Sequence, residues 1–248
     1  MANLRHVAFI TPEPRKLFDY YHHLFDLEEA WLSPTGSILT TDGLFNLAFL
    51  QQQAVTAATA GTHRADGAEL NQAQGINHFG FTTDRLEDVT DRLDDSIERG
   101  MSPQNGRPAE MRIIDPFGNN VDLSSRGFLG REEKELPGVR HVVVQAADPE
   151  TTCRFFSDAF GLATAGTTPD GSLLLSDGYV SMALTTKQTI GRPGIQYFGL
   201  QTDDWPAMQA RFRDLGQELG DPPSDGEERM MTDPEGNVFA VSDRGWLP

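Results

Sequence analysis

The chain carries one long sequence pattern twice. Residues 6–48, which begin His6-Val-Ala-Phe, recur at 141–183, which begin His141-Val-Val-Val, with a constant offset between the two copies. The matching positions are mostly apolar residues and turn residues. A duplication of this length within 248 residues predicts two similar domains of ordinary size.

The repeat continues beyond the first match. Residues 75–81, Gly-Ile-Asn-His-Phe-Gly-Phe, recur at 194–200 as Gly-Ile-Gln-Tyr-Phe-Gly-Leu. Residues 115–123, Asp-Pro-Phe-Gly-Asn-Asn-Val-Asp-Leu, recur at 233–241 as Asp-Pro-Glu-Gly-Asn-Val-Phe-Ala-Val. Nearly the whole chain is therefore covered by the duplication.

We place the domains at 1–127 and 138–248, joined by a charged linker at 128–137. Within each domain the pattern divides again into two parts of similar plan. Each part reads as a strand, a helix and three further strands. The predicted fold is therefore α+β, with four βαβββ modules.

The first module illustrates this plan. Residues 4–11 are apolar and β-branched and predict a strand, and 15–27 carry apolar residues at helical spacing. Residues 37–41 and 45–51 predict two strands around a Thr-Asp-Gly turn. The Ala-, Thr- and Gln-rich residues 54–74 predict a long loop or lid.

The second module follows the same order with a weaker third strand. Residues 76–82 predict a strand and 86–99 a helix that ends at a glycine. Residues 111–115 and 121–124 predict a hairpin. The remaining strand is expected at 103–110, where prolines and a glycine blur the pattern.

Composition excludes several classes of function. The net charge of −17 repels nucleic-acid phosphates and anionic membranes, so we expect neither as a partner. No apolar run is long enough to span a membrane, and the first residues lack a signal-peptide pattern, so we expect a cytoplasmic protein. Cys153 is the only cysteine, which rules out an intrachain disulfide. No phosphate-binding glycine loop and no Gly-x-Ser-x-Gly motif is present.

Three polar residues stand out because alternate residues of a strand share a face. His6 shares its face with Ala8, and His78 shares its face with Gly80, so small neighbours leave room beside both imidazoles. Asp122 lies within an otherwise apolar strand, where an unpartnered carboxylate is costly. Two imidazoles and one carboxylate are a ligand set for a divalent metal, with positions left open for substrate.

The two copies act as an internal control for this hypothesis. His78 becomes Tyr197 and Asp122 becomes Ala240, so the fold requires neither residue. His141, the counterpart of His6, persists in the copy that lacks the other two residues. A histidine at this position can therefore be structural. His78 and Asp122 occur only in the first copy, and this pair favours a metal site in the first domain over coincidence.

Other shared motifs are interpreted as scaffold. Asp115-Pro-Phe-Gly-Asn and Asp233-Pro-Glu-Gly-Asn occur in both copies and suit tight turns. Arg126-Gly-Phe and Arg244-Gly-Trp are also shared. We assign no catalytic role to any residue.

At these residues the chain resembles the vicinal oxygen chelate superfamily, which includes glyoxalase I, extradiol dioxygenases, and fosfomycin- and bleomycin-resistance proteins. The resemblance rests on the strand-borne His6 and His141, the Gly-Ile-Asn-His78-Phe-Gly strand and the Asp-Pro-x-Gly-Asn hairpins. It implies two tandem glyoxalase-like half-barrels around a metal. By position, the implied metal ligands are His6, His78 and Asp122, with Asp in place of the more usual Glu.

The resemblance implies a metal-dependent enzyme. The strand 46–48 reads Asn-Leu-Ala and lacks the further carboxylate of glyoxalase I, which counts against that activity. Two His and one carboxylate match non-haem iron oxygenases, so an Fe(II) extradiol-type dioxygenase, an oxidoreductase acting on a small oxygenated substrate, is favoured. In those enzymes the metal usually lies in the second domain. The alternatives are an isomerase, epimerase or lyase with Mn, Ni, Zn or Mg, and a non-catalytic binding protein for a small molecule such as an antibiotic.

Module pairing is open at this level. If the second module paired with the third, the site would contain His78, Asp122 and His141 instead of His6. Family members also exchange modules between subunits, so a homodimer is one arrangement that the resemblance allows. The expected partner is a small-molecule substrate, whose identity the sequence does not specify.

Overall fold

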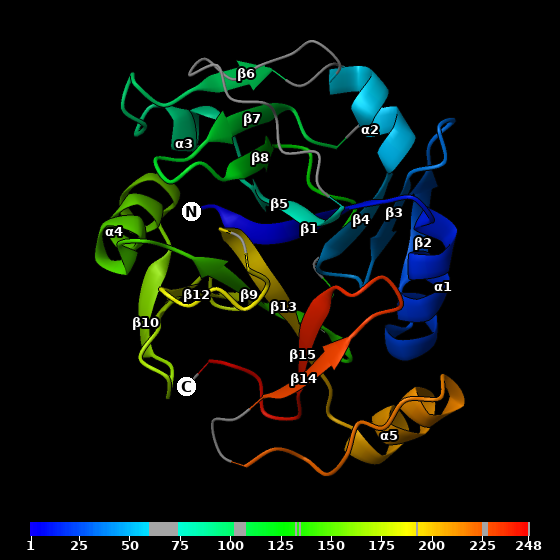
Figure 1. Cartoon of the computed structure of the whole chain (residues 1–248). Helices are drawn as coiled ribbons and strands as arrows, with labels where there is room; N and C mark the ends of the chain where they lie inside the picture. Colours follow the sequence, from blue (N-terminus) through cyan, green and yellow to red (C-terminus); the bar gives the residue numbers. More distant parts are fainter. Residues whose placement is uncertain are drawn as a thin grey trace.

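The structure is a computed structural model, and it describes residues 1–59, 74–101, 108–131, 133, 135–191, 193–224 and 228–247. Two separate β-sheets form the framework of the molecule (Figure 1). The first sheet has the strand order β2-β3-β4-β1-β5-β8-β7-β6, and the second has the order β10-β11-β12-β9-β13-β15-β14. The predicted α+β class is confirmed, with sheets that dominate and few helices.

The elements follow the predicted modules. The first sheet and its helices are β1 (Asn3–Thr11), α1 (Pro14–Phe25), β2 (Glu28–Leu32), β3 (Ile38–Thr41), β4 (Asn46–Gln51), α2 (Gln52–Thr59), β5 (Gly75–Thr82), α3 (Glu87–Thr90), β6 (Arg99–Met101), β7 (Met111–Ile114) and β8 (Asn120–Ser124). The second sheet and its helices are β9 (Gly138–Gln145), α4 (Pro149–Phe160), β10 (Ala163–Thr167), β11 (Leu173–Ser176), β12 (Ser181–Thr185), β13 (Gly194–Gln201), α5 (Trp205–Asp214), β14 (Arg229–Thr232) and β15 (Val238–Ser242). In the fourth module, the described residues form two strands after the helix instead of three.

The predicted helix at 86–99 is wrong. Only the single turn α3 forms, and its N-cap residue Leu86 offers no side-chain hydrogen bond. The side chain of Asp94 then accepts a hydrogen bond from the backbone N–H of Ser96, which favours a turn over a continued helix. The corresponding helix α5 is longer because Asp204 caps its first turn.

The segment 54–74 was predicted as a loop or lid. Its first residues instead continue the helix α2, and the remainder lies mostly outside the described residues. The strand expected at 103–110 lies mostly outside the described residues, and its described part, 108–110, is not in a strand. The strand β6 lies earlier in the chain and pairs with β7. Within the described residues, no helix is long and apolar enough to cross a bilayer.

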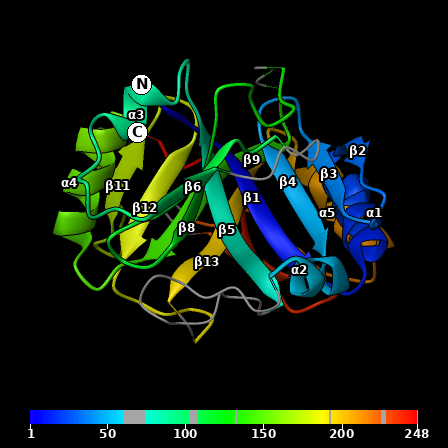
Figure 2. The same cartoon turned by 90° about the horizontal axis from the view of Figure 1, so that it is seen from above.

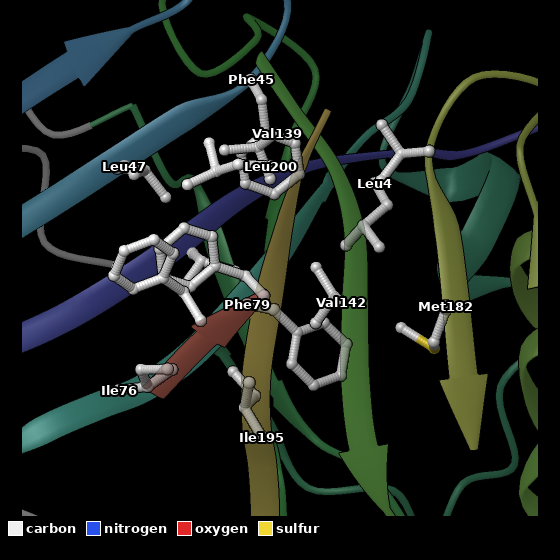
Figure 3. Packing of buried hydrophobic residues seen from close by; sticks show 14 of the residues in the cluster. Leu4, Phe45, Leu47, Ile76, Phe79, Val139, Val142, Met182, Ile195 and Leu200 are labelled. Atoms are coloured by element: carbon white, nitrogen blue, oxygen red, sulfur yellow. The ribbon is translucent and has the colours of Figure 1, made fainter. Parts of the chain in front are cut away.

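The two sheets share one hydrophobic core. Figure 3 shows side chains of both sheets packed together, among them Phe79 of β5 and Val142 of β9. Phe9 of β1 packs edge-on against Phe198 of β13, with ring centroids 5.7 Å apart. Helices α1 and α5 lie together on one side of the molecule, and α3 and α4 lie on the opposite side (Figure 2). The other face of each sheet, which carries its own small apolar cluster, is left for a binding site.

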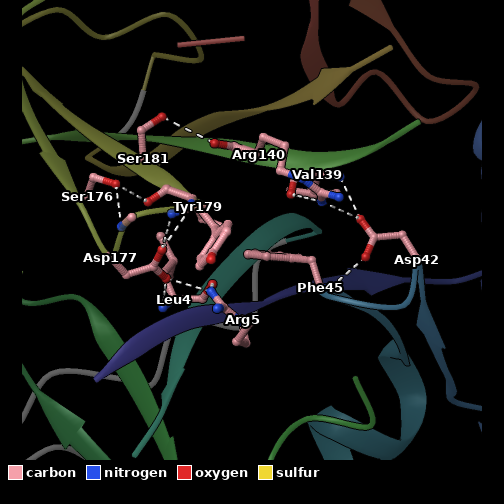
Figure 4. Close-up of polar contacts among 12 residues, drawn as sticks. Leu4, Arg5, Asp42, Phe45, Val139, Arg140, Ser176, Asp177, Tyr179 and Ser181 are labelled. Carbon is pink, nitrogen blue, oxygen red and sulfur yellow. Dashed lines mark hydrogen bonds and ion pairs between the residues drawn. The ribbon is translucent and has the colours of Figure 1, made fainter. Parts of the chain in front are cut away.

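Two equivalent ion pairs tie the sheets together (Figure 4). Arg5 of β1 donates to Asp177 at 2.6 Å, and Arg140 of β9 donates to Asp42 at 3.2 Å. Each carboxylate also accepts a backbone N–H from the partner sheet. These residues are counterparts in the repeat, so the duplication produces the same contact twice, once in each direction.

Candidate metal centre

A row of five residues crosses the middle of the first sheet. Strand pairing sets Asn46 of β4 beside His6 of β1, and His6 beside Gly80 of β5. Gly80 pairs in turn with Asp122 of β8, and Asp122 pairs with Arg112 of β7. Because strand partners in register point to the same face, this row gathers polar side chains at one place.

His78 completes the cluster from a position two residues before Gly80 on the same strand. The Nε2 atoms of His6 and His78 lie 3.4 Å apart, and His78 Nε2 lies 3.2 Å from Asp122 Oδ2. One ligand atom from each of the three residues falls within 4.8 Å of the others, and all three side chains are buried. His141 lies in the second sheet, so the structure brings together His6, His78 and Asp122 and has the arrangement in which adjacent modules pair.

Hydrogen bonds fix how each imidazole presents its nitrogens. The side-chain amide of Asn46 donates to the backbone carbonyl of Thr40, so its Oδ1 accepts from His6 Nδ1 at 2.5 Å. His78 Nδ1 lies 2.9 Å from Asn77 Oδ1. Both Nε2 atoms therefore carry a lone pair and face the cluster, as is typical of metal-ligating histidines.

Burial and neighbouring charges keep these groups in the forms that bind a cation. Burial lowers the pKa of His6 to about 3, so the ring is neutral at physiological pH. Burial alone would raise the pKa of Asp122, but the guanidinium of Arg112 outweighs it and holds that pKa well below its usual range. The site thus contains a permanent carboxylate and a neutral imidazole.

Arg112 is a further residue of the candidate site, and the sequence prediction did not include it. Its guanidinium donates from Nε to Asp122 Oδ1 at 2.6 Å and from an Nη atom to Oδ2 at 3.0 Å. The same Nη atom lies 3.1 Å from His78 Nε2. The signal was present in the repeat, because the counterpart of Arg112 is Met230, which pairs with Ala240 as Arg112 pairs with Asp122.

Phe128 has a direct part in the site, although its Arg-Gly-aromatic motif was interpreted as scaffold. Its ring stacks on His6 at a centroid distance of 4.5 Å. Gly80 makes this possible, because a Cβ there would lie 2.9 Å from both Phe128 Cζ and the backbone oxygen of Asp122. The Asp-Pro-x-Gly-Asn motifs are confirmed as turns, since Asp115 and Asp233 each accept two backbone N–H groups of their own turn.

The cluster forms the polar end of a cavity, which we name the first cavity. Its volume is about 350 Å³. Its described lining is largely apolar beyond the cluster and includes Trp31, Leu39, Leu50, Pro108 and Phe128. A cavity of this size suits a small organic molecule.

The donor set fits a divalent metal. Two Nε2 lone pairs at 3.4 Å, with a carboxylate beside them, repel one another unless a cation lies among them. In the described structure the guanidinium of Arg112 supplies that cation. A carboxylate oxygen can bind a metal while the other oxygen keeps its Arg112 bond, so Asp122 would bind through Oδ2 with Oδ1 still paired to Arg112 Nε.

Comparison with known proteins places the chain in a family. Residues 3–123 match the model of the glyoxalase/bleomycin resistance protein/dioxygenase superfamily, and residues 141–242 match a glyoxalase-like domain. The chain belongs to this superfamily and consists of two tandem glyoxalase-like domains. The predicted family and half-barrel architecture are thereby confirmed.

Solved structures share the fold of the whole chain at low sequence identity. A Mn(II)-bound glyoxalase from Novosphingobium aromaticivorans has a TM-score of 0.70 at 14% identity, with 99% of this chain and 83% of that chain covered. An extradiol ring-cleaving dioxygenase from B. fuscum has a TM-score of 0.69 at 11% identity, with 99% and 72% covered. A homoprotocatechuate 2,3-dioxygenase from Arthrobacter globiformis has a TM-score of 0.66 at 13% identity, with 99% and 80% covered.

Among curated proteins, a tRNA (guanine-N(1)-)-methyltransferase from Chlamydia trachomatis is 33% identical over 129 residues. That match covers 51% of this chain and 35% of the relative. The chain therefore spans about a third of that relative, and the methyl transfer in the relative's name describes that protein alone.

Proposed function

We propose that the chain is a divalent-metal-dependent enzyme of its superfamily, with His6, His78 and Asp122 as the metal ligands. We favour an Fe(II) extradiol-type dioxygenase acting on a small aromatic substrate with adjacent oxygens. The observation that carries the proposal is the convergence of two Nε2 lone pairs and one buried carboxylate at the end of an apolar cavity.

A bound Fe(II) would supply Lewis acidity toward two adjacent substrate oxygens and activation of dioxygen. The protein's own residues hold the ligands in place. Asn46 keeps the proton of His6 on Nδ1, and Asn77 holds His78 Nδ1 in the same way. Phe128 covers one face of the His6 ring and keeps water from it.

The remaining cavity supports an aromatic, oxygen-bearing substrate. Trp31, Leu39 and Leu50 provide an apolar wall for a planar ring. Arg112 lines the same cavity and has a guanidinium that pairs with anionic oxygens. A substrate oxygen that loses its proton at the polar end would therefore meet a fixed positive charge.

Oxygen consumption tests the proposal. Protein loaded anaerobically with Fe(II) is mixed with a panel of catechols, and oxygen uptake is followed with an electrode. We expect catechol-dependent uptake by the wild type and by His141→Ala, and none by His78→Ala. No uptake by iron-loaded wild type with any catechol would contradict the dioxygenase, and a product that forms without oxygen would indicate the redox-neutral isomerase or lyase.

One observation favours a second candidate, a binding protein without a metal. Arg112 already neutralises Asp122 through two hydrogen bonds and contacts His78, so the cluster is electrostatically satisfied as described. Under this alternative the first cavity would bind its ligand equally well in His78→Ala and in metal-free wild type. Under the enzyme proposal, catechol binding measured by calorimetry weakens at least tenfold in both.

A further inference from the structure

The second domain keeps a cavity where the first has its candidate metal centre. This second cavity has a volume of about 410 Å³, and its lining includes His141, Val143, Ala183, Tyr197 and Glu228. Its apolar part belongs to the small cluster on the outer face of the second sheet. The second domain therefore has a cavity at the equivalent place, with Tyr197 and Ala240 where the first domain has two of its candidate ligands.

Strand register shows how the two cavities correspond. The row that holds the cluster of the first domain is repeated in the second sheet as Ser181, His141, Gly199, Ala240 and Met230. Apolar side chains thus replace the carboxylate and its arginine. The second cavity lacks the ligand set for a metal among its described residues, so its chemistry must come from other groups.

His141 presents an unused acceptor. The Ser181 hydroxyl donates to the backbone carbonyl of Arg140 at 3.2 Å, so its oxygen accepts from His141 Nδ1 at 2.6 Å. The opposite nitrogen, Nε2, is fully buried and has no hydrogen-bond partner among the described residues. Such a buried, unpaired acceptor is costly in the absence of a ligand.

Glu228 presents a second hydrogen-bond acceptor without a partner among the described residues. Its Oε1 accepts from Trp246 Nε1 at 3.0 Å, and its buried Oε2 has no partner among the described residues. Trp246 also stacks on His141 with ring centroids 4.8 Å apart, which places both acceptors at one end of the cavity. The Tyr197 hydroxyl also hydrogen-bonds with the Glu228 carboxylate. Burial, together with this carboxylate, raises the pKa of the tyrosine hydroxyl, and burial also raises the pKa of Glu228.

The counterpart of Glu228 in the first domain behaves differently. Oε2 of Glu110 accepts hydrogen bonds from the backbone and hydroxyl of Ser125 and from the backbone of Arg126, and Oε1 pairs with the Arg126 guanidinium at 3.3 Å. The second copy has Asp243 in place of Ser125, and a carboxylate there cannot donate to Glu228. Both oxygens of Glu110 have partners, whereas Glu228 Oε2 meets none of the equivalent donors.

We propose that the second cavity is a binding site for a small organic cation with two or more N–H donors, such as an amidinium or a primary ammonium. His141 Nε2 and Glu228 Oε2 accept from its nitrogens, and Val143 and Ala183 contact its apolar part. The carboxylate of Asp170 in the lining is already paired with Lys187 at 2.9 Å, so Glu228 is the lining carboxylate that faces the ligand. The site is separate from the first cavity and does not depend on its proposed metal.

Calorimetry with benzamidine as the probe tests this proposal on the full chain. We expect saturable binding of one benzamidine per chain, and at least tenfold weaker binding of neutral benzyl alcohol and of anionic benzoate. The comparison among the three probes needs no variant. No saturable binding of benzamidine, or equal binding of benzoate, would overturn the proposal.

Variants then locate the site. Glu228→Gln is nearly isosteric and His141→Phe keeps the stack on Trp246, and each should weaken benzamidine binding at least tenfold. Glu218→Gln, which removes an exposed carboxylate of the same domain, and His78→Ala, in the first cavity, should leave it unchanged. Far-ultraviolet circular dichroism checks that each variant is folded. Unchanged binding by folded Glu228→Gln, or a loss in Glu218→Gln, would overturn the assignment.

Discussion

Replacing Arg112 with methionine should destabilise the metal-free protein and tighten its binding of a divalent metal. Methionine is the residue at the corresponding position of the second domain, Met230, so this part of the sheet accommodates it. The variant removes both hydrogen bonds to Asp122 and the guanidinium that lies 3.1 Å from His78 Nε2. The substitution should therefore lower the stability of the metal-free protein and increase the stabilisation that a bound metal provides.

The magnitudes follow from burial. Removing one partner of a buried ion pair costs about 3–5 kcal/mol. The Asp122 side chain is 5% exposed but that of Arg112 is 37% exposed, so solvent screens part of the pair. We therefore expect a loss of about 2–3 kcal/mol in the free energy of unfolding without metal.

Metal affinity should change in the opposite direction. Arg112 occupies both oxygens of Asp122 and contacts His78, so it competes for two of the three proposed ligands. Orientation of the carboxylate by Arg112 would favour metal binding, but one of its two bonds must break before Oδ2 is free. Competition is therefore the larger effect, and we expect at least tenfold tighter binding, about 1.4 kcal/mol.

Urea unfolding with and without Mn(II), together with calorimetric Mn(II) titration, measures both quantities. Metal should raise the unfolding free energy of Arg112→Met more than that of the wild type. Arg85→Met, which removes an exposed ion pair with Asp88, serves as the matched control and should change neither quantity. Unchanged or weaker Mn(II) binding by Arg112→Met would refute the reasoning.

Three further outcomes are expected from urea unfolding. Gly80→Ala should lose about 1–3 kcal/mol, because its Cβ would meet Phe128 and the backbone at 2.9 Å, and a neutral effect would contradict the close packing. Asp42→Asn should lose about 3 kcal/mol by leaving Arg140 buried without its ion-pair partner, and a loss below about 1 kcal/mol would contradict a role for this pair in joining the sheets. Burial lowers the pKa of His141 to about 3 from 6.5, so below pH 6.5 the unfolded chain binds a proton that the folded chain does not. Stability should therefore fall by about 1.4 kcal/mol per pH unit from this group as the pH decreases toward 5, and an equal slope in His141→Phe would contradict it.

The sequence predicted those parts of the fold that depend on local pattern. Strand alternation placed His6 and His78 beside small neighbours and marked Asp122 as a carboxylate in an apolar strand, and the structure brings the three residues together. The Asp115 turn was likewise readable, because an aspartate that accepts its own turn's N–H groups needs only nearby residues. His6 rather than His141 joins the cluster because β1 pairs with β5. This pairing is long-range, and the sequence favoured it only because the first and second modules are adjacent in the chain.

Other features depended on contacts that pattern does not encode. The helix expected at 86–99 has helical periodicity but lacks a capping side chain, and turn formation at Asp94 competes with it. Arg112 reaches Asp122 only because of hairpin register between β7 and β8. Arg112 and Met230 also differ between the two copies, so the repeat contains a third asymmetric position beside His78 and Asp122.

Metal stoichiometry tests the central proposal most directly. Wild type, Asp122→Ala and His141→Ala are saturated with Mn(II), passed over a desalting column and assayed for metal per chain. We predict one Mn(II) per chain in the wild type and in His141→Ala, and a loss of the metal in Asp122→Ala. Equal metal content in wild type and Asp122→Ala, or a loss confined to His141→Ala, would contradict a metal site formed by His6, His78 and Asp122.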